Sequence, residues 1–144
     1  MTTLRLAHDL TEILEWRRRV VADVFGCPPT ESLIAANAEY LEHTGAYDFY
    51  VAEIDGEPVG CGAVCYSREM PSPDNPSGRN GYLMNIFTVP EARGHGVAHA
   101  VVEALVGRAR SRGCDKIWLE TTQAARGVYS DLSFADFPNL MILR

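Results

Sequence analysis

One short segment constrains the fold of this chain more than any other, because it joins an apolar run to a helix through two glycines. The apolar run covers residues 82–89, and the joining segment is Arg93-Gly94-His95-Gly96-Val97-Ala98. Apolar residues then recur with a helical period as far as Arg112. Glycines let the backbone approach an anion, and the first N–H groups of a helix point toward it at the positive end of the helix dipole. The segment therefore predicts a phosphate-binding turn between a strand and a helix.

Two common phosphate motifs do not fit this turn. A P-loop carries Lys and then Ser or Thr after its last glycine, where this chain has Val97 and Ala98. A dinucleotide fingerprint needs Gly or Ala where His99 stands, and it belongs on an early strand. From the six residues alone, a structural turn without a ligand and a nucleotide-phosphate site both stay open.

The rest of the chain predicts a mixed α/β domain. Asp9 and Glu12 form a capping-box pattern before a helix, Thr30 can cap a second helix that stops at Gly45, and Asp55-Gly56 marks a hairpin turn. The expected strands are residues 4–7, 49–54, 59–66, 82–89, 116–121 and 140–143. The expected helices follow Asp9 and Thr30 and cover residues 97–112 and 124–132.

These elements predict a mostly antiparallel sheet with helices on both faces. A helix connects strands 82–89 and 116–121, so this pair alone should be parallel. The length of 144 residues fits a single domain over residues 1–144. The connection 67–80 is long and rich in Pro, Ser, Gly and Asn, which is typical of a functional or mobile loop.

The net charge, the hydrophobicity pattern and the cysteine spacing argue against several kinds of partner and site. The net charge of −6 argues against a nucleic-acid partner, and neither a membrane-spanning run nor a signal peptide is found, so a cytoplasmic protein without membrane contact is expected. Cys61 and Cys65 lie about 13 Å apart along a predicted strand, too far for a disulfide. Together with Cys27 and Cys114 they form no C-x-x-C pair, so free thiols and no metal site are predicted.

Three segments together resemble the GNAT superfamily of N-acetyltransferases. Residues 93–98 are similar to its acetyl-CoA pyrophosphate loop, Gln/Arg-x-x-Gly-x-Gly/Ala, and residues 82–91 to its fourth strand with the Pro-Glu turn. Residues 128–134 are similar to its Leu-Tyr-x-x-Leu-Gly-Phe segment, with Ser133 in place of the usual Gly. About ten residues follow Phe134, so the tail fits one final strand better than the family's usual two.

The resemblance implies a GNAT-like fold that uses acetyl-CoA as cosubstrate. It implies direct attack on the thioester by a primary amine of a small molecule or a protein, and it is compatible with a homodimer. The strand backbone would hold the pantetheine arm and the acetyl oxygen, and the glycine turn the pyrophosphate. The implied cofactor-binding residues are Phe87, Thr88, Val89, Arg93, Gly94, His95, Gly96, Val97 and Ala98, with Arg126 as a further phosphate contact.

The implied proton donor to the departing thiolate is Tyr129, whereas no single residue is implied as the base that deprotonates the amine. Many relatives carry a strand glutamate where this chain has Met84, so Glu53, Tyr82 and Glu120 are the candidates. Asn85, a polar residue in an apolar strand, would bond either the substrate or a neighbouring backbone group. The connection 67–80 is expected to border the acceptor site. The alternative function is a catalytically silent acyl-CoA-binding sensor or partner module, which Met84 favours.

Overall fold

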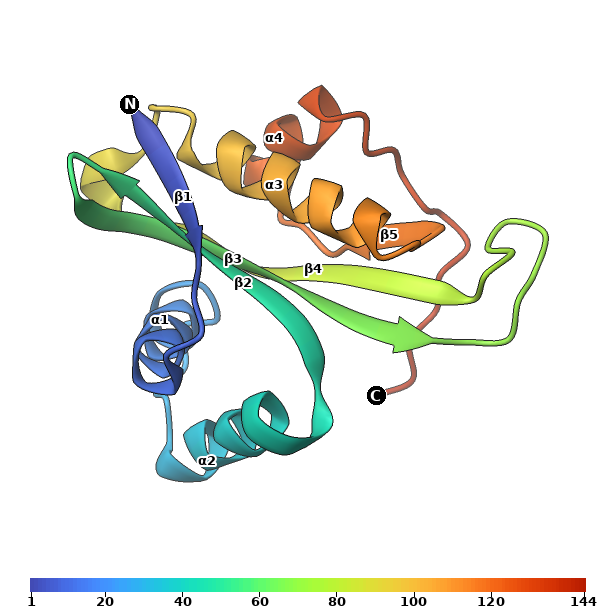
Figure 1. The fold of residues 1–144 in the computed structure, drawn as a ribbon, viewed down its shortest axis with the longest axis horizontal. Coiled ribbons are helices and arrows are strands. Elements are labelled where there is room, and N and C mark those ends of the chain that lie inside the picture. The colour runs from blue at the N-terminus through green and yellow to red at the C-terminus, as the bar shows by residue number, and fades with distance from the viewer.

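The centre of the molecule is a five-stranded mixed sheet with the strand order β1-β2-β3-β4-β5 (Figure 1). The computed structural model describes residues 1–43 and 45–144. Neighbouring strands pair antiparallel from β1 to β4, whereas β4 and β5 are parallel, as the helical crossover predicts. The strands are β1 Thr2–Leu6, β2 Ala46–Ile54, β3 Glu57–Arg68, β4 Arg79–Thr88 and β5 Lys116–Leu119.

Helices cover both faces of the sheet, which confirms the predicted fold class. Figure 1 shows α1 and α2 on one face and α3 and α4 on the other. Within the described residues, no helix combines the length and the apolar character needed to cross a lipid bilayer. The helices are α1 Leu10–Asp23, α2 Glu31–Glu39, α3 Val97–Ser111 and α4 Arg126–Asp131, with 3-10 turns at Pro90–Ala92 and Gln123–Ala125 and a π-helical turn that begins at Tyr40.

The sheet separates two apolar cores. The core beneath α1 is built from its inward residues and from alternate residues of β2, β3 and β4: Ile13, Trp16, Val20, Phe49, Val51, Cys61, Ala63 and Phe87. The core beneath α3 uses the other face of the same strands: Ala52, Val64, Leu83, Val97, Val101, Val102, Leu105 and Ala109. All four cysteines are free, as predicted.

Local sequence signals place most element ends. Asp9 caps α1 by accepting a hydrogen bond from the Thr11 N–H at 3.0 Å, and Thr30 caps α2 in the same way. The capping box is incomplete, because the Glu12 carboxylate binds the Arg5 guanidinium instead of reaching back to the cap. The hairpin between β2 and β3 turns at Asp55-Gly56 with φ of 51° and 81°, the geometry of a type I′ turn.

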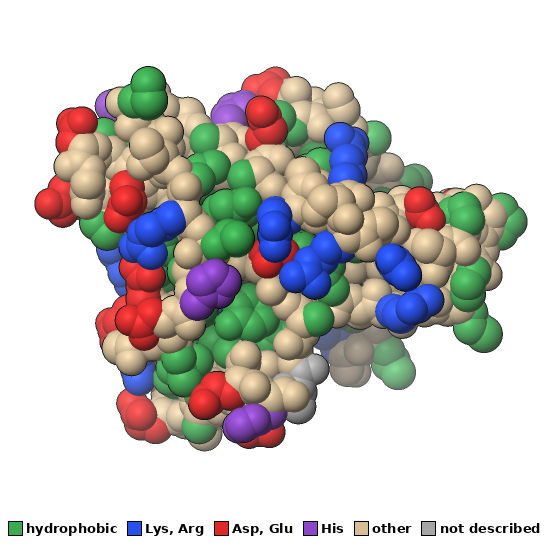
Figure 2. Space-filling model, in the orientation of Figure 1, with side chains coloured by type: hydrophobic (Ala, Val, Ile, Leu, Met, Phe, Trp, Pro, Cys, Tyr) green, Lys and Arg blue, Asp and Glu red, His purple; other side chains and the backbone are tan. Residues whose placement is uncertain are grey.

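Basic side chains gather over the C-terminal half of α3 and the neighbouring strand ends on the face shown in Figure 2. Two of them, Arg108 and Arg112, pair with the buried Asp48 carboxylate at 3.1 and 3.3 Å. Burial opposes ionisation of Asp48, but these arginines and the Tyr66 hydroxyl hold its pKa below the usual value. The cluster fastens α3 to β2 and complements the negative end of the helix dipole.

The predicted last strand, residues 140–143, is wrong. These residues are described and form no strand, and Leu140, Met141, Ile142 and Leu143 are 53–99% exposed. A strand needs the backbone of a neighbour to pair with, and an apolar composition does not supply one. Figure 1 shows the tail leaving α4 and running past β5 toward the far ends of β3 and β4.

The end of α4 forms a tight left-handed turn, although Ser133 stands where the sequence resemblance leads one to expect glycine. Ser133 adopts φ +72°, the Ser133 N–H donates to the Ser130 carbonyl, and the Phe134 N–H donates to the Tyr129 carbonyl, both at 3.0 Å. These two bonds define a Schellman motif, and the edge-to-face packing of Phe134 on Tyr129, with ring centroids 5.9 Å apart, is its apolar contact. Ser133 therefore occupies a left-handed conformation that glycine adopts without strain.

We expect Ser133→Gly to stabilise the protein. The left-handed conformation costs a non-glycine residue about 1–2 kcal/mol, so the free energy of unfolding should rise by about 1 kcal/mol and Tm by about 3–5 °C. Thermal unfolding followed by circular dichroism measures the change. Ser130→Gly is the matched control, because the same change inside α4 should lower the stability by roughly 0.5–1 kcal/mol. An unchanged or lower Tm for Ser133→Gly would contradict the strain.

Candidate active site

A β-bulge in the middle of β4 shapes the candidate site. Ala63 of β3 pairs with Met84 and Cys61 pairs with Phe87, so two residues of β4, Asn85 and Ile86, stand opposite one residue of β3. Asn85 adopts φ +60°, a left-handed conformation that Asn tolerates better than most residues. As a result, the side chains of Met84 and Asn85 lie on the same face of the sheet although they are consecutive.

Strands β4 and β5 stop pairing next to this bulge. Their parallel ladder runs from Asn80–Lys116 to Leu83–Leu119, whereas β4 continues to Thr88. No other strand of the described residues pairs with that edge of β4 beyond Leu83. The divergence leaves backbone N–H and C=O groups of β4 available to a ligand between the two strands.

The glycine turn before α3 lies open at the end of β4. Gly94 and Gly96 have φ of 82° and 77°, and a Cβ added at either would meet no described atom within 4 Å. Gly96 is the N-cap of α3, and no described side chain caps this end, so the first N–H groups of the helix face open space. The predicted succession of strand, glycine turn and helix is confirmed. Its binding of phosphate remains a prediction.

The two arginines assigned to the cofactor differ in their surroundings. Arg93 folds back over the end of β4, where its Nε donates to the Thr88 carbonyl at 3.1 Å and its guanidinium lies 5.9 Å from the Phe87 ring centroid. Arg93 is exposed, so its remaining donors are accessible from solvent. Arg126 forms an ion pair with Asp136 of the tail, which partly neutralises its charge. His95 is exposed between the glycines.

Tyr129 lies on α4 with its ring buried against the core beneath α3. Burial alone raises the pKa of its hydroxyl above the usual value, and no hydrogen bond joins that hydroxyl to another described residue. It also borders a cavity of about 230 Å³ between β5, α4 and the tail. A protonated phenol without a hydrogen-bond partner is free to donate its proton to a ligand, as a general acid must.

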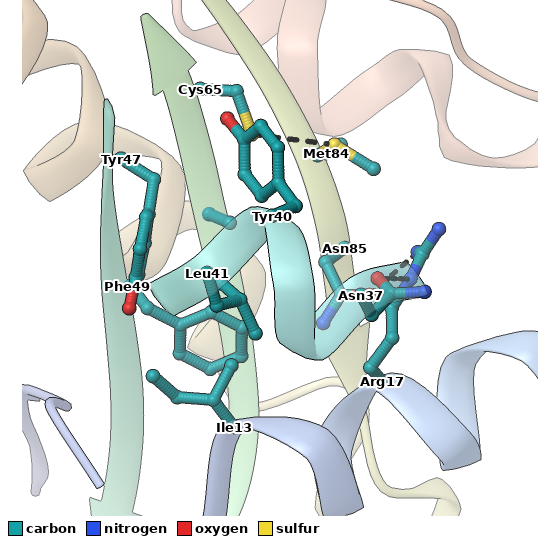
Figure 3. Close-up of a pocket in the computed structure, with 11 residues that line it drawn as sticks. Ile13, Arg17, Asn37, Tyr40, Leu41, Tyr47, Phe49, Cys65, Met84 and Asn85 are labelled. Carbon is teal, nitrogen blue, oxygen red and sulfur yellow. Dashed lines mark hydrogen bonds between the residues drawn. The ribbon is translucent and has the colours of Figure 1, made fainter. Parts of the chain in front are cut away.

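A second cavity, of about 280 Å³, lies on the opposite face of the sheet beneath α1 and α2 (Figure 3). Figure 3 shows Tyr47 and Phe49 of β2 forming one wall, and Arg17, Asn37 and Asn85 gathered at the other. The cavity therefore has an apolar side and a polar side. It is lined by Ile13, Arg17, Asn37, Tyr40, Leu41, Tyr47, Phe49, Ala63, Cys65, Met84 and Asn85.

The fold places the candidate bases in two different parts of the molecule. Tyr82 packs against Trp118 across β4 and β5, with ring centroids 4.5 Å apart and the ring planes tilted by 44°. Burial and then the neighbouring Glu120 carboxylate raise the pKa of Tyr82, so its phenol is protonated at neutral pH and cannot itself accept the amine proton. The exposed Glu120 at the end of β5 is thus the carboxylate that the structure places beside Tyr82.

The structure does not bring Glu53 into either cavity. Its carboxylate pairs with Arg5 at 3.2 Å, and Arg5 in turn pairs with Glu12 of α1, so the three residues form a network across β1 and β2. This arrangement could not be predicted from the sequence, because Glu53 and Arg5 are separated by 48 positions and meet only through strand pairing. Glu53 therefore lies apart from the bulge.

The connection 67–80 does not reach the cavity of Figure 3, so its place beside the acceptor site stays a prediction. Strand β3 extends to Arg68 and β4 begins at Arg79, and none of the described residues 69–78 lines the cavity of Figure 3. The connection instead fastens to the start of β5, through the Ser77 N–H to the Asp115 carboxylate at 2.9 Å and an ion pair of Glu69 with Lys116 at 3.5 Å.

Sequence reasoning also missed Arg17. The residues of this cavity come from α1, α2, β2, β3 and β4, so their proximity depends on the tertiary fold. One signal was present: Arg17 falls on the apolar stripe of α1, four residues after Ile13 and three before Val20. A charged residue on the buried side of an amphipathic helix is a candidate for function.

Known proteins are similar to this chain in both sequence and fold. The model of the Acetyltransferase (GNAT) family matches residues 10–134. Glucosamine 6-phosphate N-acetyltransferase 1 of Oryza sativa subsp. japonica is 31% identical over 112 residues, 76% of this chain and 66% of the rice protein, so the chain spans just under two thirds of that relative. IAA acetyltransferase of Azospirillum brasilense is 34% identical over 134 residues, 91% of this chain and 80% of that protein. A protein of Clostridium acetobutylicum described as a predicted acetyltransferase, solved with acetyl-CoA, has a TM-score of 0.85 and 26% identity, covering 100% of this chain and 96% of that chain.

Proposed function

Because the chain belongs to the GNAT family of acetyltransferases, we propose that it transfers an acetyl group from acetyl-CoA to a primary amine. One observation carries the proposal. The β4–β5 ladder ends at Leu83–Leu119, and β4 itself ends at Thr88. The open glycine turn begins five residues later, at Arg93. A thioester arm between the diverging strands would reach a pyrophosphate held at the start of α3. The solved acetyltransferase with acetyl-CoA supports this cosubstrate through its likeness over the whole chain.

In the proposed reaction the amine nitrogen attacks the thioester carbonyl carbon. A C–N bond forms, the C–S bond breaks, and the nitrogen loses a proton while the thiolate gains one. Free N–H groups on the open edge of β4, from Asn85 to Thr88, would stabilise the developing oxyanion. Such donors contribute about 3 kcal/mol each when they are already in position.

The two protons take different routes in this proposal. Tyr129 would donate to the departing sulfur, since its hydroxyl is neutral and unpaired among the described residues. About one alkyl amine in a thousand is neutral at pH 7, because its pKa is near 10.4, so deprotonation needs about 4 kcal/mol of assistance. We assign that assistance to Glu120, the carboxylate beside the neutral Tyr82 phenol.

We further propose that the acceptor is a small molecule. The cavity beneath α1 and α2 opens beside the bulge and has about 280 Å³, near the lower limit of about 300 Å³ for ligand sites. The rice relative is named for a small amine acceptor, glucosamine 6-phosphate.

The direct test is release of the CoA thiol, detected by a colorimetric thiol reagent. We expect the purified protein to release thiol from acetyl-CoA when a panel of small primary amines is added, and to release little without an amine. Mass spectrometry of the amine should show the added acetyl group. Because Met84 stands where many relatives carry a strand glutamate, a silent acyl-CoA-binding module is the second candidate. Stabilisation by CoA without thiol release for any amine would favour that module.

A further inference from the structure

Arg17 is a half-buried cation whose charge has no carboxylate partner among the described residues. It lies on α1, and burial lowers its pKa, while the only groups that oppose this effect are thiols and a phenol. The neighbouring Arg18, by contrast, pairs with Glu15 and Glu31. Arginine remains protonated at neutral pH, so the polar end of the cavity carries an uncompensated positive charge.

Two amides hold the Arg17 guanidinium in place. Its Nε donates to the Asn37 side-chain oxygen at 3.1 Å, and its Nη1 donates to the Asn85 side-chain oxygen at 3.0 Å (Figure 3). The orientation of each amide is fixed, because Asn37 donates to the Leu33 carbonyl at 2.9 Å and Asn85 donates to the Cys61 sulfur at 3.6 Å. Both partners are neutral, so they orient the cation without cancelling its charge.

The geometry leaves the guanidinium equipped to bind an anion. It carries five N–H donors, of which the two amides use two, so three remain for a ligand. A planar guanidinium with neighbouring free donors matches a carboxylate, which accepts two parallel hydrogen bonds. The opposite wall, formed by Leu41, Tyr47 and Phe49, offers no charge and suits an apolar group.

From this arrangement we propose that the acceptor is an apolar amino acid or a close analogue, whose carboxylate binds Arg17 while its apolar part rests on Leu41, Tyr47 and Phe49. The inference rests on the proposed acetyl transfer and names the substrate class of that site. The amine would extend past Met84 toward the gap between β4 and β5. An amino acid is a zwitterion, so the protein's net charge of −6 does not repel it at long range.

The test compares amines that differ only in the carboxylate. Phenylalanine, leucine and tryptophan are assayed for thiol release beside 2-phenylethylamine, isoamylamine and tryptamine. We expect at least one amino acid to have a kcat/KM at least tenfold above its decarboxylated partner, the scale of a charge-assisted hydrogen bond. Equal or better use of every decarboxylated amine would overturn the assignment of Arg17 and leave the acetyltransferase intact. Absence of thiol release with all six would instead count against both.

Variants at Arg17 link the preference to one residue. Arg17→Met should lower kcat/KM for the amino acid at least tenfold through KM, and leave the decarboxylated amine within about threefold. Arg17→Lys should recover part of the loss, because it restores the charge without the planar donor pair. Arg18→Met is the matched control: it removes the same charge one position away on the same helix, and it should leave both substrates unchanged. An equal loss in Arg18→Met would show a general charge effect and overturn the proposal.

A binding measurement avoids dependence on folding of the Arg17 variants. 3-Phenylpropionate carries the apolar group and the carboxylate but no amine, so it should inhibit the wild-type protein in competition with the amino acid and not with acetyl-CoA. 3-Phenylpropionamide has the same shape without the charge and should inhibit at least tenfold more weakly. Equal inhibition by the two compounds would contradict a carboxylate site at Arg17.

Discussion

Gly96→Val should abolish the stabilisation of the protein by CoA while the protein still folds. The side chain would occupy the open space before α3, where the backbone must approach the pyrophosphate, and it would block the N–H groups at the start of the helix. We expect CoA to raise Tm by several degrees in the wild-type protein and to give no measurable shift in the variant. Differential scanning fluorimetry with and without CoA measures both.

A second glycine supplies the control for backbone strain. Valine at φ +77° costs about 1–2 kcal/mol, so the variant alone should be less stable than the wild-type protein. Gly26, in the turn after α1, has φ +66° and equally open surroundings, so Gly26→Val carries the same penalty away from the turn. It should lose the same stability and keep the full response to CoA. Undiminished CoA binding in Gly96→Val would refute the assignment of the turn.

Tyr129→Phe should lower kcat about a hundredfold and leave acetyl-CoA affinity within a few-fold. The variant keeps the edge-to-face packing on Phe134 and removes only the hydroxyl, so it opens no cavity. General acid catalysis contributes about 10²–10⁴-fold, and the lower end applies because a thiol of pKa near 8.5 already leaves readily near neutral pH. Steady-state kinetics of thiol release gives kcat, and CoA titration gives the affinity.

The pH profile shows over which range Tyr129 stays protonated and so available as the acid. Burial raises the pKa of this phenol above its usual value near 10, so the hydroxyl keeps its proton throughout the neutral and mildly alkaline range. We therefore expect no loss of kcat from ionisation of Tyr129 between pH 7 and 9.5. Wild-type kcat in Tyr129→Phe would make this residue a packing tyrosine and shift the proton to a water-mediated route.

Features that depend on a few neighbouring residues could be predicted from the sequence. The left-handed turn at Asp55-Gly56, the caps at Asp9 and Thr30, and the glycine turn before α3 all follow from local backbone chemistry. The parallel pairing of β4 with β5 follows from chain connectivity. These signals predicted the glycine turn and the parallel strand pair, where we propose that the cofactor binds.

Features that depend on distant partners could not be predicted in this way. Glu12 leaves the capping box because Arg5 of β1 offers it a charged hydrogen bond. The apolar tail residues 140–143 stay outside the sheet, because composition does not specify a pairing neighbour. The cavity of Figure 3 brings together residues of five elements around Arg17, and the absence of a carboxylate beside this arginine among the described residues is visible only in the tertiary structure.

The bulge at Asn85 also inverts the alternation of β4. Before it, even-numbered positions such as Met84 face α1 and odd-numbered ones such as Leu83 face α3; after it, Phe87 faces α1 and Ile86 faces α3. Odd- and even-numbered side chains therefore face opposite cores in the two halves of the strand, and the extra residue of the bulge makes this exchange possible. Deleting Asn85 would send either the first or the second half of the strand to the wrong core, so this position tolerates substitution far better than a change in chain length.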